Sequence, residues 1–152
     1  YYKGYKLKCA IGKSGITSNK KEGDLSTPKG VYKINTLYYR KDKIKKFKCK
    51  IKKKVIKKNM GWCDDINSKF YNKLIKSKKE IGHEKLFRKD GIYDILIPIK
   101  FNTIKPKRNK GSAIFLHLTN NYKKTLGCIT LKKKDMLILL KLINSKTKIK
   151  IT

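Results

Sequence analysis

The chain of 152 residues has the length of one folded domain, is 39% hydrophobic and carries a net charge of +32. No apolar run approaches the roughly 18 residues that cross a membrane, so we predict no transmembrane segment. Only three of the 42 basic residues are arginines, Arg40, Arg88 and Arg108, and this lack of guanidinium forks argues against a dedicated nucleic-acid-binding protein. We expect a single, monomeric domain over residues 1–152, with most lysines in solvent and a general attraction to anionic polymers.

The first half of the chain predicts strands separated by turns. Alternating apolar and polar side chains favour strands over residues 6–11 and 31–39, and a half-exposed, lysine-rich strand over residues 45–52. The loop between the first two strands is rich in turn formers, and we expect its acids, Glu22 and Asp24, to be structural first. In the Gly-Trp-Cys-Asp-Asp stretch at 61–65, the only tryptophan is expected in the core and the aspartates as caps.

The second half predicts two short helices and three strands. Helices are expected over residues 77–87 and 132–143, and strands over residues 93–101, 113–118 and 148–152. Because Pro98 lacks an amide donor, it indicates a strand edge or a bulge. A basic loop at 105–111 and the connection at 119–124 would give any nearby cleft a positive rim. The whole pattern predicts a mostly β, largely antiparallel sandwich or barrel.

Residues 111–131 contain the one plausible pair of nucleophile and base. In a buried strand over 113–118, His117 shares a face with core side chains, and the polar connection returns the chain to Cys128 on a neighbouring strand. A nearby imidazole can take the proton of a thiol, so we expect His117 to depress the pKa of Cys128 and make it the most reactive cysteine. Gly127 allows a tight turn whose N–H groups can form an oxyanion hole. The alternative is a structural cysteine beside a satisfied core histidine.

The other cysteines are Cys9, Cys49 and Cys63, and no Cys-x-x-Cys pair is present. Zinc-ligand spacing is therefore missing, and we predict neither a metal nor a cofactor.

Several sequence blocks occur in one order along nearly the whole chain. They are Ile11-Gly-Lys-Ser-Gly15, Lys21-Glu-Gly-Asp24, Thr27-Pro-Lys-Gly30, Gly61-Trp-Cys-Asp-Asp65, Tyr71-Asn72, Glu84-x-Leu-x-Arg-x-Asp90, Tyr93-Asp94, Gly111-Ser-Ala-Ile-Phe-Leu-His117 and Thr125-x-Gly-Cys-Ile-x-Leu131. Together they resemble the L,D-transpeptidase (YkuD-type) catalytic domain family, in its compact single-domain branch. The resemblance implies a β-rich fold and an active-site cleft bordered by the loop at 22–30.

The resemblance also implies a reaction. Cys128 would attack the carbonyl after the third residue of a peptidoglycan tetrapeptide stem and expel the terminal D-alanine. His117 would be the general base and acid, and the backbone around Gly127 and Cys128 would hold the oxyanion. Many members carry Arg two residues after the nucleophile, where this chain has Thr130. Its substrate contacts are expected from the residues of this turn and of the central block, namely Thr125, Thr130, Lys132, Trp62 and Asp64.

Three other functions stay open at this point: a carboxypeptidase or amidase that hydrolyses the same thioester, a non-catalytic envelope-binding module, and a basic nucleic-acid-binding domain. Stem peptides and anionic cell-wall polymers are the expected partners. We expect a bacterial cell-envelope location, in the periplasm or the cell wall, reached through a leader outside these 152 residues. The cytoplasm is the alternative.

Overall fold

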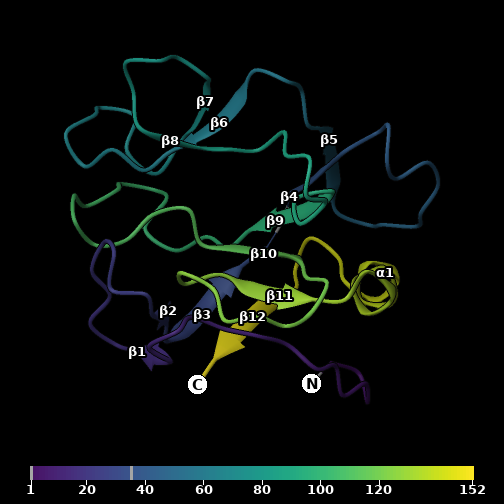
Figure 1. Cartoon of the computed structure of the whole chain (residues 1–152). Helices are drawn as coiled ribbons and strands as arrows, with labels where there is room; N and C mark the ends of the chain where they lie inside the picture. The colour runs from purple at the N-terminus through teal and green to yellow at the C-terminus, as the bar shows by residue number, and fades with distance from the viewer. Residues whose placement is uncertain (1, 35) are drawn as a thin grey trace.

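A central five-stranded sheet organises the computed structural model, which describes residues 2–34 and 36–152 (Figure 1). Its order is β11-β10-β9-β4-β5; a sheet of order β7-β6-β8 lies above it in Figure 1, and the pairs β12-β3 and β1-β2 lie below. The bounds are β1 Ile16–Thr17, β2 Thr27–Pro28, β3 Gly30–Lys33, β4 Thr36–Tyr39, β5 Lys52–Val55, β6 Met60–Cys63, β7 Leu74–Lys76, β8 His83–Lys85, β9 Ile95–Pro98, β10 Phe115–Leu118, β11 Ile129–Leu131, α1 Lys133–Leu142 and β12 Lys148–Ile151.

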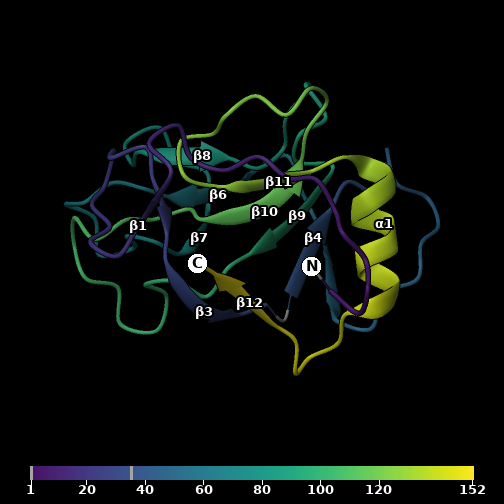
Figure 2. The same cartoon turned by 90° about the horizontal axis from the view of Figure 1, so that it is seen from below.

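The central sheet is mixed. Strand β9 runs antiparallel to both β10 and β4, whereas β10 and β11 are parallel, as are β4 and β5. Helix α1 follows β11 directly and lies beside the sheet, as the view from below shows (Figure 2). The mostly β fold class predicted from the sequence is confirmed, with one helix rather than two among the described residues.

Residues of the central strands alternate between two cores. Ile97 of β9 and Leu116 of β10 face an aliphatic core that also holds Leu140 of α1. Phe115, next along β10, faces the second core, which holds Trp62. Each fully buried aliphatic side chain contributes about 1.5–3 kcal/mol. The alternation predicted for residues 113–118 therefore describes the two sides of β10 correctly.

The helix predicted over residues 77–87 is wrong. Residues His83–Lys85 form β8, which pairs antiparallel with β6. His83 itself is bound on both sides, with Nε2 2.6 Å from Ser77 Oγ and Nδ1 2.6 Å from the carbonyl oxygen of Ile81. The helix was predicted from two apolar residues, Ile81 and Leu86. A pattern this short does not distinguish a helix from a strand.

Other strand predictions differ in their bounds. Residues 6–11 are not a strand, and Ala10 forms only an isolated bridge with Thr130. The lysine-rich strand lies at 52–55 rather than 45–52, and the predicted strand at 31–39 is divided into β3 and β4, with position 35 outside the described residues. Pro98 ends an inner strand instead of marking a sheet edge, because its missing N–H falls where the ladder stops.

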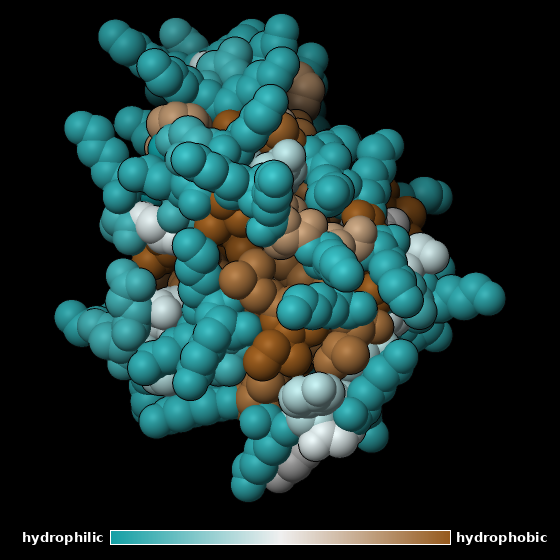
Figure 3. Space-filling view, turned by 90° about the vertical axis from the view of Figure 1, so that its right-hand side faces the viewer, coloured by the Kyte–Doolittle hydropathy of each residue, from teal (hydrophilic) through white to brown (hydrophobic). Residues whose placement is uncertain are grey.

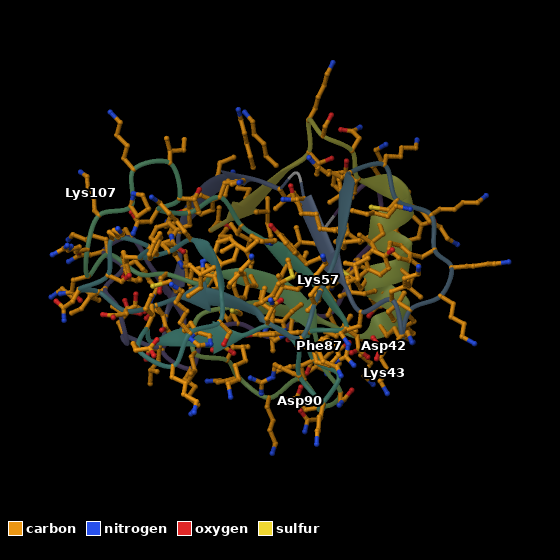
Figure 4. All side chains as sticks on the ribbon, turned by 90° about the horizontal axis from the view of Figure 1, so that it is seen from above. Asp42, Lys43, Lys57, Phe87, Asp90 and Lys107 are labelled. Carbon is orange, nitrogen blue, oxygen red and sulfur yellow. The ribbon has the colours of Figure 1, made fainter. Side chains whose placement is uncertain are left out.

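A buried arginine connects the end of β4 to the segment after β8. Arg40 is 5% exposed, and its Nε and Nη2 donate to the carboxylate of Asp42 at 2.8 and 2.5 Å. Its guanidinium stacks on Phe87, with Cζ 3.5 Å from the ring centroid. Figure 4 shows Phe87 and Asp42 close together, with Lys107 projecting from the other end of the molecule. The arginine thus fixes a loop of a lysine-rich region to the body of the fold.

The surface is dominated by hydrophilic side chains. On the side seen in Figure 3 they project around a smaller apolar area. Among residues 2–34 and 36–152, the only helix has 10 residues, far short of a membrane span. All four cysteines are free, Cys9 in solvent and Cys63 fully buried.

Candidate active site

Strand β10 fixes both the position and the tautomer of His117. The residue is 6% exposed and lies opposite Thr130 in the parallel register of β10 and β11. Its Nδ1 is 2.9 Å from the carbonyl oxygen of Leu118. Because a carbonyl only accepts hydrogen bonds, Nδ1 carries the ring proton, and Nε2 is left unprotonated. This is the form in which an imidazole takes a proton from a nucleophile.

An aromatic wall holds the imidazole ring. His117 packs edge-on against Tyr93, with centroids 5.0 Å apart and planes at 81°. The guanidinium of Arg88 lies 5.2 Å from the centroid of Tyr93. Arg88 in turn donates from Nη1 to Glu84 at 3.1 Å, and from Nε to Oδ1 and Oδ2 of Asp90 at 3.1 and 3.0 Å. The Glu84-x-Leu-x-Arg-x-Asp90 block therefore builds the wall against which the histidine rests.

Cys128 lies at the end of a tight turn, directly before β11. Thr125 Oγ1 donates to the carbonyl oxygen of Cys128 at 2.6 Å and accepts the N–H of Gly127 at 3.1 Å. Gly127 has φ 146°, and a Cβ there would lie 2.9 Å from the carbonyl oxygen of Ser26. Only glycine fits this backbone. The N–H of Gly127 is engaged within the turn, so the part played by this glycine is to shape the turn.

The thiol of Cys128 is held against the segment that carries the histidine. The N–H of Phe115 donates to Sγ at 3.4 Å, and Sγ donates to the carbonyl oxygen of Ala113 at 3.3 Å. Cys128 and His117 line the same cavity, of about 520 Å³. The structure thus brings the sequence-predicted nucleophile and base together on neighbouring strands.

Burial sets the resting protonation states of the pair. It lowers the pKa of His117 to about 4, against an opposing effect of the carbonyls of Leu118 and Ile92. Burial also raises the pKa of Cys128 to about 12, against the stabilising N–H of Phe115. At neutral pH the pair is a thiol and a neutral imidazole. The expectation that His117 depresses the pKa of Cys128 is therefore wrong: burial raises this pKa, and the groups that oppose burial are the N–H of Phe115 and the charge of Lys20.

The loop at residues 20–30 braces the turn of Cys128 from the opposite side. Thr27 is fully buried, and its Oγ1 donates to the carbonyl oxygen of Gly127 at 2.9 Å. Thr27 Oγ1 in turn accepts a hydrogen bond from the N–H of Gly12 at 2.9 Å. One hydroxyl therefore ties together three segments that are far apart in the sequence.

The two acids of this loop have different places. Asp24 accepts the backbone N–H of Lys21 at 2.8 Å and that of Ser26 at 2.9 Å, which closes the loop as an Asx-type turn. Glu22 lines the cavity and accepts a hydrogen bond from Tyr71. The structural role expected for Asp24 is confirmed, whereas Glu22 faces the site.

Asn72 links the tryptophan block to the nucleophile. It is 2% exposed, and its Oδ1 accepts Trp62 Nε1 at 2.9 Å and the N–H of Ala113 at 3.1 Å. Its Nδ2 donates to the carbonyl oxygens of Phe101 at 3.1 Å and Asn102 at 2.6 Å. The carbonyl oxygen of Ala113 accepts the hydrogen bond from the Cys128 thiol. Sequence reasoning missed Asn72 as a positioning residue, since its one signal was its place in a recognised block.

Most of the predicted site residues line the cavity. Those that do are Asp64, His117, Thr125, Gly127, Cys128 and Thr130. Trp62 and Lys132 are not among the lining residues. Trp62 is 7% exposed and packs edge-to-face on Phe115 at 5.3 Å, so it belongs to the core. Lys132 is exposed, with Nζ 5.4 Å from the ring centroid of Tyr122.

Comparison with known families matches residues 2–151 to YkuD, the L,D-transpeptidase catalytic domain. The chain belongs to this family. No curated protein and no solved structure was found to match. The resemblance drawn from the sequence blocks is confirmed, and the YkuD family acts on peptidoglycan.

This YkuD domain has a buried hydroxyl two residues after Cys128. Thr130 is 2% exposed, and its Oγ1 has no hydrogen-bond partner within residues 2–34 and 36–152. An unpaired buried hydroxyl costs about 1–3 kcal/mol. Thr130 also lies opposite His117 and lines the same cavity.

The charges around the cavity of this YkuD domain are mixed. The cations are Lys20, Arg88, Lys123 and Lys124, and the acids are Glu22, Asp64, Glu84 and Asp90. Four of the ten acids of the chain therefore line one cavity. The connection at 119–124 contributes cations as expected, but the basic loop at 105–111 contributes none, so the predicted positive rim is only partly right.

Proposed function

We propose that the protein is a cysteine acyltransferase that acts on peptidoglycan stem peptides, with residues 1–152 working as one catalytic domain. The observation that carries the proposal is the placement of the Cys128 thiol. It is held by backbone groups of Phe115 and Ala113 and lies in the same cavity as a histidine whose Nε2, unprotonated in this tautomer, can accept a proton. Family membership supplies the substrate class.

The acylation step follows from the resting states of the two groups. His117 Nε2 takes the thiol proton as Sγ of Cys128 forms a bond to the carbonyl carbon of the third stem residue. The N–H of Cys128 is the backbone donor that we assign to the resulting oxyanion. The C–N bond to the terminal D-alanine then breaks, and the imidazolium returns its proton to the leaving amine. A thioester and free D-alanine result.

The thioester then passes to an acceptor. The amine of a second stem attacks the thioester carbon, a C–N bond replaces the C–S bond, and the proton returns to sulfur through His117. Because the nucleophile rests as a thiol, proton removal is part of the acylation step. We place this chemistry in the bacterial cell envelope, where the substrate occurs.

Substrate contacts are assigned to polar groups of the cavity. We assign hydrogen bonds from the stem to the hydroxyl of Thr130 and to the carboxylate of Asp64, and a turn-shaping role to Thr125. Trp62 acts through Asn72, which it contacts directly, rather than on the substrate. Lys132 remains a candidate only for the outer part of a long substrate.

Mass spectrometry of intact protein mixed with a tetrapeptide stem tests the proposal. We expect an adduct on Cys128 whose mass corresponds to the stem without its terminal D-alanine, and no adduct on Cys128→Ala. Addition of a D-amino acid acceptor should yield an exchanged peptide if the thioester is transferred, and free tripeptide if it is hydrolysed. The absence of any adduct with correctly folded protein would refute the acyl-enzyme.

A further inference from the structure

Lys20 differs from every other lysine of the described chain. It is 6% exposed, whereas all the other lysines within residues 2–34 and 36–152 are exposed. Burial of an ammonium group costs several kcal/mol unless the charge is paired. Lys20 is therefore a buried lysine in a chain whose other described lysines are exposed, and it lines the cavity that holds Cys128.

Contacts of both the ammonium group and the aliphatic stem fix the Lys20 side chain. Its Nζ donates to Asp24 Oδ1 at 2.5 Å and to the carbonyl oxygen of Lys21 at 2.8 Å. Its aliphatic stem packs against Gly111, where an added Cβ would lie 2.8 Å from Cγ and 3.1 Å from Cε. An ammonium group has three N–H donors, and these two bonds account for two of them.

The charge of Lys20 acts on the reaction centre. Burial raises the pKa of the Cys128 thiol, and the positive charge of Lys20 acts in the opposite direction. The counter-ion Asp24 also accepts two backbone N–H groups, whose dipoles offset part of its negative charge. Lys20 is thus a fixed cation close to the thiol in a partly dry site, where charge–charge interactions are strong.

The other cations of the cavity are less suited to bind an anion. The guanidinium of Arg88 is already bound to the carboxylates of Glu84 and Asp90. Lys123 and Lys124 are exposed, so solvent and salt screen their charges. The carboxylate of a leaving amino acid lies only a few bonds from the carbonyl that the thiol attacks. Its binding residue must therefore line this same cavity.

We infer that Lys20 is the residue that binds the terminal carboxylate of the donor stem, through its third N–H and its fixed charge. The inference rests on the proposed function for the identity of the substrate. It gives this chain a specificity-determining residue before β2, whereas the residue two positions after the nucleophile, Thr130, carries no charge. A single ammonium group recognises a carboxylate by charge, without the bidentate geometry of a guanidinium.

Binding to Cys128→Ala protein tests Lys20 without requiring turnover. The probes are a synthetic stem tetrapeptide that ends in D-alanine and the same peptide with a C-terminal amide. A charge-assisted hydrogen bond predicts that the acid binds about tenfold more tightly than the amide. In Cys128→Ala/Lys20→Met this preference should disappear, and in Cys128→Ala/Lys20→Arg it should be kept in part.

Lys21→Met, in the same background, is the matched control, because Lys21 is exposed and contributes only its backbone. It should keep the full preference for the acid. If Cys128→Ala, which keeps Lys20, bound the acid and the amide with equal affinity, the inference would be overturned even if Lys20→Met failed to fold. So would a preference that Lys20→Met leaves unchanged.

The acylation assay on the wild-type protein separates this inference from the proposed function. A Lys20-dependent preference without any acyl-enzyme would support the carboxylate site and remove the proposed chemistry. An acyl-enzyme together with a preference independent of Lys20 would keep the chemistry and overturn the inference.

Discussion

The two faces of the central sheet differ in the kinds of side chains that they bury. On the face that packs on α1, the core is almost entirely aliphatic, with Leu116 and Leu118 of β10 against Met136 and Leu140 of the helix. On the opposite face, β10 presents Phe115 and a histidine among aromatic rings and buried hydrogen bonds. One strand of four residues thus contributes both to the core and to the candidate active site.

The site face requires more precise side-chain geometry than the α1 face. Aliphatic side chains pack without direction, so the α1 face tolerates changes that keep its volume. The site face depends on directed hydrogen bonds, in which each buried donor or acceptor that loses its partner costs about 1–3 kcal/mol. Changes on the α1 face should therefore reduce stability alone, and changes on the site face should reduce stability and activity together.

The largest loss is expected from Asn72→Ala. The substitution leaves Trp62 Nε1, the N–H of Ala113 and two carbonyl oxygens without their partners. We expect the free energy of unfolding in urea to fall by about 4 kcal/mol. The acylation rate of the folded protein should fall as well, because Ala113 positions the thiol. An unchanged acylation rate would show that the two functions of this network are separable.

A slightly smaller loss is expected from Leu140→Ala on the opposite face. Leu140 is fully buried in the aliphatic core, and removal of its side chain should cost about 3 kcal/mol in urea unfolding. The acylation rate measured well below the unfolding transition should match the wild type. A reduced rate would mean that the two faces are mechanically coupled through β10.

His117 should make stability depend on pH. Its pKa falls from 6.5 to about 4 on folding, so the unfolded chain takes up a proton in a pH range where the folded protein does not. The free energy of unfolding should therefore decrease as the pH falls from about 6.5 to about 4, by about 3 kcal/mol from this group. In His117→Gln this component should vanish. Parallel stability curves for the two proteins would contradict the assignment.

The smallest loss is expected from Thr27→Val. Its side chain is nearly isosteric, but it lacks the hydroxyl that binds Gly127 and Gly12. We expect about 2 kcal/mol lower stability and slower acylation. Thr147→Val is the matched control, since its Oγ1 accepts the N–H of Asn144 at the edge of the aliphatic core, far from the cavity. It should lower stability without changing acylation.

The fold class and several strands could be predicted from local patterns, although the bounds of β5 were not. Period-two alternation located β9, β10 and the split pair β3 and β4, since each strand separates side chains between two surfaces. The same method failed for residues 77–87, because β8 is specified by its partner β6 and not by its own short pattern.

The site could be predicted in part. Cys128 and His117 were identified from residue chemistry and family resemblance, and the structure places both in one cavity. Asn72 and Thr27 escaped because their partners lie far away in the sequence. Lys20 escaped because its burial in the cavity is a property of the assembled fold. The raised pKa of Cys128 also escaped, because burial is a property of the assembled fold.

The hydrogen bond from Thr27 to the carbonyl of Gly127 spans 100 residues of the chain. Contacts of such sequence separation form late, because a long loop must close before they contribute. We therefore expect the turn around Cys128 to reach its final geometry only when the first quarter of the chain has docked against it. A partly folded chain should then carry the thiol without the turn that holds it in place.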